Sequence, residues 1–125
     1  MFNNVLLVGL GGAAGSISRY LCQRWVNEYY QHSFPLATFL VNISGCLLIG
    51  ILYALAERAN ILSQPTRLLL ITGFCGGFTT FSTFAFENMN LLRTGDHFYF
   101  LLYAIGSVVL CIAGVYAGSL LIKLL

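Results

Sequence analysis

Four long apolar stretches occupy almost the whole chain. They run from about Val5 to Trp25, Leu36 to Ala56, Leu68 to Phe86 and Phe98 to Ile122, and the last three contain no charged residue. A membrane-spanning helix needs about 20 apolar residues, so each stretch is long enough to cross a bilayer. The chain is 58% hydrophobic and only 8% charged, which is typical of a membrane protein. We therefore predict a single all-α integral membrane domain over residues 1–125.

The expected spans cover about residues 4–27, 35–58, 66–93 and 98–123, and the third contains an unusual segment. Thr72–Phe84 reads T-G-F-C-G-G-F-T-T-F-S-T-F, in which Gly76 and Gly77 are followed closely by four hydroxyl residues. Glycine and β-branched residues both weaken helices. We predict a helix broken at its middle, near residues 75–79, where the two glycines permit an irregular backbone, with positive φ at Gly77.

A break in a membrane helix has a functional implication. Lipid offers no hydrogen bonds, so irregular backbone is tolerated only where it is buried in protein or lines a cavity. The hydroxyls and phenyl rings of the third stretch therefore indicate a place where a polar species binds or passes.

The positive charges give little orienting force. With four spans, Arg58, Arg67 and Lys123 fall on one side of the membrane, and Arg19, Arg24 and Arg93 fall on the other. Orientation normally follows an excess of Lys and Arg on the cytoplasmic side. Either the chain inserts both ways up and forms antiparallel dimers, or other features set one orientation; charge alone leaves both open.

Small residues four apart offer close helix packing, and three such pairs occur: Gly11/Gly15, Gly73/Gly77 and Gly114/Gly118. This spacing lets helix backbones approach each other, most often within one subunit. Four short helices enclose little volume, so a hydrated path indicates a dimer or a larger assembly.

Uncharged polar residues within the spans are functional candidates, because polar groups are costly in a membrane. Asn42 lies midway along the second span, and Tyr103, Ser107 and Cys111 share one face of the fourth. Any single hydroxyl can instead bond its own helix backbone. Phe81 and Phe84 either pack as ordinary hydrophobic side chains or offer positive ring edges, which, like hydroxyl hydrogens, suit a small anion.

The four cysteines lie in apolar stretches without a CxxC pair, and both histidines lie in or beside connectors. We predict no structural disulfide and no metal bound by these side chains.

Three motifs together resemble the CrcB/Fluc fluoride channel family. They are G-F-C-G-G-F-T-T-F-S-T-F in the third span, V-N-I-S-G in the second and G-x-x-x-x-x-S-R-Y in the first. The resemblance covers the whole chain. It implies an antiparallel, dual-topology homodimer in the bacterial inner membrane that exports fluoride passively, with a structural sodium ion at its centre. The implied partners are fluoride, a second copy of the chain and the lipid bilayer, with no nucleic acid.

The resemblance also implies roles for individual residues. Phe81 and Phe84 match the family's aromatic pair, and Asn42 matches its pore asparagine. The sodium ion would be held by the backbone carbonyls of Gly76 and Thr79. Tyr103 and Ser107 match a polar track along the fourth helix. Arg19 matches an arginine with a structural or electrostatic role. Further pathway positions are matched by Thr38, Ser82, Thr83 and Glu87. Cys111 departs from the pattern, since relatives can continue the track there with a serine, and a thiol is a weaker donor.

Two other classes of protein fit less well. A small antiporter of guanidinium or drug-like cations would share the size and charge balance, but it should carry a carboxylate in the first span, which has none. A membrane enzyme would need an acid, base or nucleophile within reach of one another. The deep residues are Asn, Ser, Thr and Phe, so the sequence does not indicate an enzyme.

Overall fold

The chain folds into helices that make four candidate membrane spans. The computed structural model describes residues 1–58 and 61–125. The first, second and last spans are α1 (Phe2–Tyr29), α2 (Leu36–Glu57) and α6 (His97–Leu124). The third consists of α3 (Gln64–Arg67), η1 (Leu68–Cys75), α4 (Gly76–Phe78) and α5 (Phe81–Arg93). The observed bounds lie close to the expected ones.

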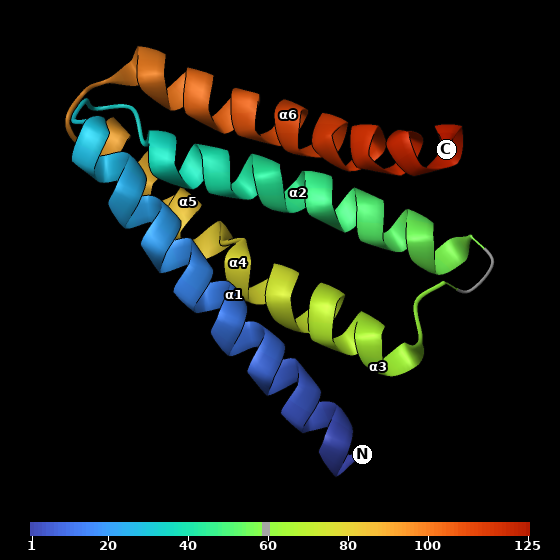
Figure 1. Cartoon of the computed structure of the whole chain (residues 1–125). Coiled ribbons are helices and arrows are strands. Elements are labelled where there is room, and N and C mark those ends of the chain that lie inside the picture. Colours follow the sequence, from blue (N-terminus) through green and yellow to red (C-terminus); the bar gives the residue numbers. More distant parts are fainter. Residues whose placement is uncertain (59–60) are drawn as a thin grey trace.

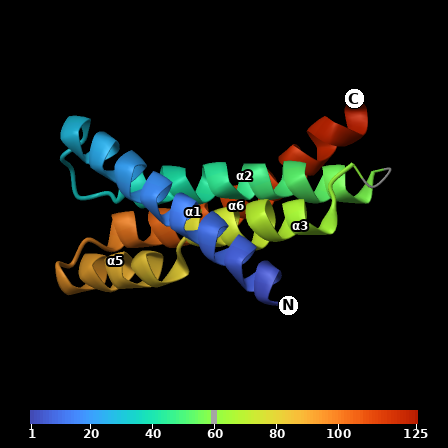
Figure 2. The same ribbon diagram turned by 60° about the horizontal axis from the view of Figure 1, so that its bottom comes forward.

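The spans alternate in direction. Both chain termini, the end of α2 and the start of α3 lie at one end of the molecule, and the α1–α2 and α5–α6 connections lie at the opposite end (Figure 1). As a result α2 and α6 run side by side in the same direction. α1 crosses the others obliquely, as the second view also makes clear (Figure 2). Large apolar side chains are exposed along α1 and α6, as expected for surfaces that face lipid.

Glycines bring α2 and α6 into backbone contact. A Cβ built at Gly50 would lie 2.1 Å from the carbonyl oxygen of Val115, and one at Gly118 would lie 2.2 Å from that of Leu47. Neither position could hold a side chain without moving a helix. The predicted packing role of Gly118 within one subunit is therefore confirmed.

A second glycine contact joins α1 to the third span. A Cβ at Gly11 would lie 2.1 Å from the carbonyl oxygen of Leu69, and one at Gly15 would lie 2.1 Å from that of Phe74. From the other side, a Cβ at Gly77 would lie 2.4 Å from the carbonyl oxygen of Gly12. The two predicted pairs on α1 and the third span thus pack against each other.

The third span is irregular in a way that differs from the prediction. η1 is a π-helix, and Gly76 continues the helix with φ −62° and ψ −37°. The break lies just beyond, where Thr79 and Thr80 are both extended, with ψ of 157° and 123°. The prediction of a positive φ at Gly77 is wrong. Among the glycines of the described residues, only Gly95 has a positive φ. Gly77 is required instead by the close approach of α1.

Candidate functional site

The break in the third span is held by a side chain from α2. Asn42 donates from Nδ2 to the carbonyl oxygen of Thr80 at 3.0 Å and accepts at Oδ1 from the Thr80 N–H at 2.9 Å. In a continuous helix that N–H would bond the carbonyl of Gly76, four residues earlier. The amide therefore replaces a helical bond, and one N–H of Nδ2 remains for another acceptor.

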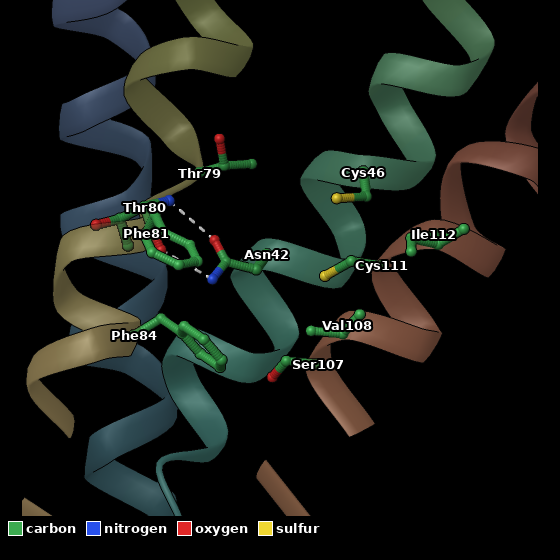
Figure 3. A pocket seen from close by; sticks show the side chains of 10 residues that line it. All are labelled: Asn42, Cys46, Thr79, Thr80, Phe81, Phe84, Ser107, Val108, Cys111 and Ile112. Carbon is green, nitrogen blue, oxygen red and sulfur yellow. Dashed lines mark hydrogen bonds between the residues drawn. The ribbon is translucent and has the colours of Figure 1, made fainter. Parts of the chain in front are cut away.

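An open groove of about 340 Å³ lies directly beside this joint. Its walls come from α2, the break, the start of α5 and the middle of α6 (Figure 3). The lining residues are Asn42, Cys46, Thr79, Thr80, Phe81, Phe84, Ser107, Val108, Cys111 and Ile112. Four residues predicted as fluoride-pathway positions thus share one cavity: Asn42, Phe81, Phe84 and Ser107.

The two phenyl rings at the groove have different surroundings. Phe81 and Phe84 are tilted against each other by 44°, with ring centroids 5.5 Å apart. Phe84 also packs against Tyr103, with centroids 4.9 Å apart, whereas the Phe81 side chain is 78% exposed. Phe84 is thus part of the packed interior, and Phe81 stands at the open side of the groove.

Ser107 supplies a hydroxyl that nothing else in the described chain uses. Its Oγ atom is buried and has no hydrogen-bond partner among residues 1–58 and 61–125. A buried polar group without a partner costs about 1–3 kcal/mol, so such groups call for an explanation. The Ser107 side chain lies on the groove wall formed by α6 (Figure 3).

A second polar cluster links four helices. The Tyr103 hydroxyl donates to Glu87 Oε1 at 2.9 Å, and the Thr38 hydroxyl donates to Glu87 Oε2 at 3.1 Å. Gln23 on α1 donates from Nε2 to Thr38 Oγ1 at 3.1 Å. Three predicted pathway residues, Thr38, Glu87 and Tyr103, therefore meet at one carboxylate. Tyr103 and Thr38 are fully buried, while Glu87 is half-buried.

The hydroxyls of Thr79 and Thr80 at the break bond the local backbone, and those of Ser82 and Thr83 contact Thr80. Thr79 donates to the carbonyl of Cys75 in its own helix at 2.9 Å. Thr80 caps α5, because its Oγ1 accepts from the Thr83 N–H at 3.3 Å. Thr80 Oγ1 also donates to Thr83 Oγ1 at 3.1 Å and lies 3.5 Å from Ser82 Oγ. The Thr79 hydroxyl hydrogen is therefore used within its own helix, whereas Thr83 only accepts a bond from Thr80 and keeps its own hydroxyl hydrogen.

Comparison with known proteins identifies the family. The family model of the CrcB-like protein, Camphor Resistance (CrcB), matches residues 6–119. This chain belongs to the CrcB family. A CrcB relative from Chlorobaculum tepidum, named fluoride-specific ion channel FluC, is 49% identical over 124 residues, 99% of this chain and 98% of the relative. Relatives of the same name from Phocaeicola vulgatus and Leptospira interrogans are 49% and 43% identical, covering 92% and 96% of this chain and 94% of each relative.

In this CrcB chain, Gly76 and Thr79 flank the break from its α4 side. The Gly76 carbonyl loses its helical partner because the Thr80 N–H bonds Asn42. Thr79 is extended, so its carbonyl lies outside both helices. Gly76 is also exposed, with no atom within 4 Å of a Cβ built on it. A carbonyl without its helical partner on exposed Gly76 and one on the extended, half-buried Thr79 are oxygen ligands of the kind that a hard cation prefers.

The CrcB sequence motifs did not indicate every residue at the site. Thr80 was expected only as one hydroxyl among several, yet its backbone forms the joint with Asn42. Gln23 was not singled out; its one signal is a neutral polar side chain one turn after Arg19 on the first span. Arg19 itself is half-buried on α1. Cys46 was interpreted as a small apolar residue but lines the groove.

Proposed function

We propose that this chain is a fluoride-selective channel that exports fluoride passively across the bacterial inner membrane, and not an enzyme. The relatives named fluoride-specific ion channels match it along nearly its whole length. The structural observation that carries the proposal is the buried Ser107 hydroxyl, which has no partner in the described part of the chain and lies in a groove with Asn42, Phe81 and Phe84.

The chemistry of the groove suits a small anion. A pore must replace the water around an ion with groups that hold it weakly enough to let it leave. The Ser107 hydroxyl, the second N–H of Asn42 and the phenyl edges are donors without formal charge. A buried cation would attract fluoride more strongly but would also trap it. The groove-lining residues include no Lys, Arg or His, which is consistent with passage.

The groove supports an assembly of two copies. It is open on one side, where the apolar Phe81 ring is 78% exposed next to polar groups at membrane depth. Irregular backbone at membrane depth is tolerated only where protein covers it or where it lines a cavity, and a second copy would cover the break and the exposed Phe81 ring. We propose an antiparallel homodimer, because equal numbers of Lys and Arg on the two sides permit both orientations.

The same dimer would hold a structural sodium ion. Gly76 is exposed and Thr79 is half-buried at the break, and a twofold axis there would bring together four of their carbonyl oxygen atoms, two from each copy. Sodium would offset the repulsion between these carbonyl dipoles. Its role would be to fix the register of the two subunits and not to take part in conduction.

Ion efflux from liposomes tests the function directly. The purified protein is reconstituted, and efflux of fluoride is compared with that of chloride. We expect rapid fluoride efflux and little chloride efflux. The variant Ser107→Ala should conduct less fluoride, whereas Ser44→Ala should not, because Ser44 is exposed and its hydroxyl bonds only the Val41 carbonyl of its own helix. Equal efflux of both halides would contradict the selectivity, and proton-coupled uptake of a guanidinium cation would favour an antiporter.

A further inference from the structure

Two cysteines from different helices line the groove beside Ser107. Cys46 lies on α2 and Cys111 on α6. Both are half-buried, and both thiols point into the same cavity (Figure 3). The cavity therefore gives this pair of thiols a shared, open environment.

The helix backbones are close at this level of the bundle. A Cβ built at Gly114 would lie 3.6 Å from the Cβ of Cys46. The Cβ of Cys46 therefore packs directly against the α6 backbone. Cys111 lies three residues before Gly114, so it occupies the same face of α6. The two cysteines thus lie on facing surfaces of neighbouring helices, about one helical turn apart.

The surroundings select among the products of thiol oxidation. A sulfinate would place a charge in the membrane interior, and a glutathione adduct would have to fit a large polar group into the groove. A disulfide is neutral and adds no atoms. The Cys75 side chain is fully buried and does not line the groove. Access therefore favours Cys111 as the partner of Cys46.

We propose that Cys46 and Cys111 form a redox-active thiol pair, and that their oxidation to a disulfide restricts fluoride passage. Two S–H bonds break and one S–S bond forms, while two electrons and two protons pass to an oxidant of the hydroperoxide or azo class. The disulfide removes both S–H groups from the groove and fixes α2 against α6. The effect on passage rests on the proposed function, whereas the formation of the disulfide does not.

The test uses diamide, an azo oxidant that is reduced to its hydrazine. The reconstituted protein is treated with diamide, and its mass and disulfide-linked peptides are determined. We expect a loss of two hydrogen atoms, a link between Cys46 and Cys111, and reversal by dithiothreitol. Fluoride efflux should fall to a small fraction of its initial rate and recover on reduction. Diamide should leave efflux of Cys111→Ser unchanged relative to the same variant untreated, and should still inhibit Cys75→Ala.

The mass and flux measurements separate the possible failures. Absence of the link, or a link from Cys46 to Cys75, would overturn the thiol pair. A complete Cys46–Cys111 link with unchanged efflux would overturn its effect on passage. Lack of fluoride efflux in the untreated protein would overturn the proposed function, while the mass measurement would still decide whether the pair forms.

Discussion

The side-chain amide of Asn42 bonds both backbone groups of Thr80, 38 residues further along the chain. The amide takes over the N–H that the helix loses where Thr79 and Thr80 become extended. One side chain of α2 thus fixes the angle between α4 and α5, and with it the position of Phe81 at the start of α5. The asparagine shapes the groove as well as lining it.

We expect Asn42→Ala to destabilise the fold and abolish fluoride efflux. The substitution removes both bonds to Thr80, and a buried polar group left without a partner costs about 1–3 kcal/mol. Thermal unfolding in detergent and efflux from liposomes are the measurements. Ser44→Ala, on the same helix, is the matched control because its hydroxyl bonds only the Val41 carbonyl. An unchanged melting temperature for Asn42→Ala would show that the bridge contributes nothing to stability.

The adjacent glycines Gly76 and Gly77 should differ in how well they tolerate an added methyl group. Gly77→Ala would place a Cβ 2.4 Å from the Gly12 carbonyl oxygen, whereas Gly76→Ala meets no atom within 4 Å. Overpacking typically costs about 1–3 kcal/mol. We expect Gly77→Ala to lower the melting temperature clearly and Gly77→Val to prevent folding, with Gly76→Ala close to wild type in stability. Equal tolerance at both positions would refute the contact between α1 and α4.

Substitution of Phe84 should affect both stability and conduction, whereas substitution of Phe81 should affect conduction alone. Phe84→Ile loses the contact with Tyr103, and an aromatic pair contributes about 0.5–1.5 kcal/mol beyond its buried area. Phe81→Ile removes a largely exposed ring and should leave the fold of the single chain intact. Both variants lose the positive ring edge, so fluoride efflux should fall in both. Undiminished efflux in both would mean that the rings serve only for packing.

Added lysines test whether both orientations are needed. Gln31→Lys with Ser33→Lys adds two positive charges between α1 and α2. Ile61→Lys with Gln64→Lys adds two at the start of the third span. All four positions are exposed. Each pair should bias insertion one way, because orientation follows small Lys/Arg differences. In a fluoride-sensitive bacterial strain, we expect neither variant alone to protect and the two together to restore protection. Full protection by either alone would contradict the antiparallel dimer.

Sodium removal tests the proposed ion between the two breaks. After long exchange into a large organic cation, we expect a lower dimer melting temperature and slower fluoride efflux. Because the ligands would be backbone oxygens, Thr79→Ser should be mild: serine keeps a hydroxyl that can bond the Cys75 carbonyl, as Thr79 does. If neither property depends on sodium, the break serves the anion path alone.

Hydropathy was enough to predict the four spans, because membrane thickness fixes how long an apolar helix must be. The break was also expected close to its true place, but the sequence assigned it to the wrong residues. A glycine can be needed either for a positive φ or because another backbone packs closely against it. Only the structure shows that the second reason applies at Gly77, where the Gly12 carbonyl of α1 lies close. For the same reason, Asn42 could be predicted at the site while its partner, the Thr80 backbone, could not.

The contact between α1 and the third span has a consequence for the lipid around the protein. At Gly11, Gly15 and Gly77 the two helices meet backbone to backbone, without side chains between them. Such a seam is thinner than an acyl chain, so lipid tails have no room to enter it. On the α1 side, hydrocarbon is thereby kept away from the irregular backbone of the break by the absence of side chains, and not by bulky residues placed as a barrier.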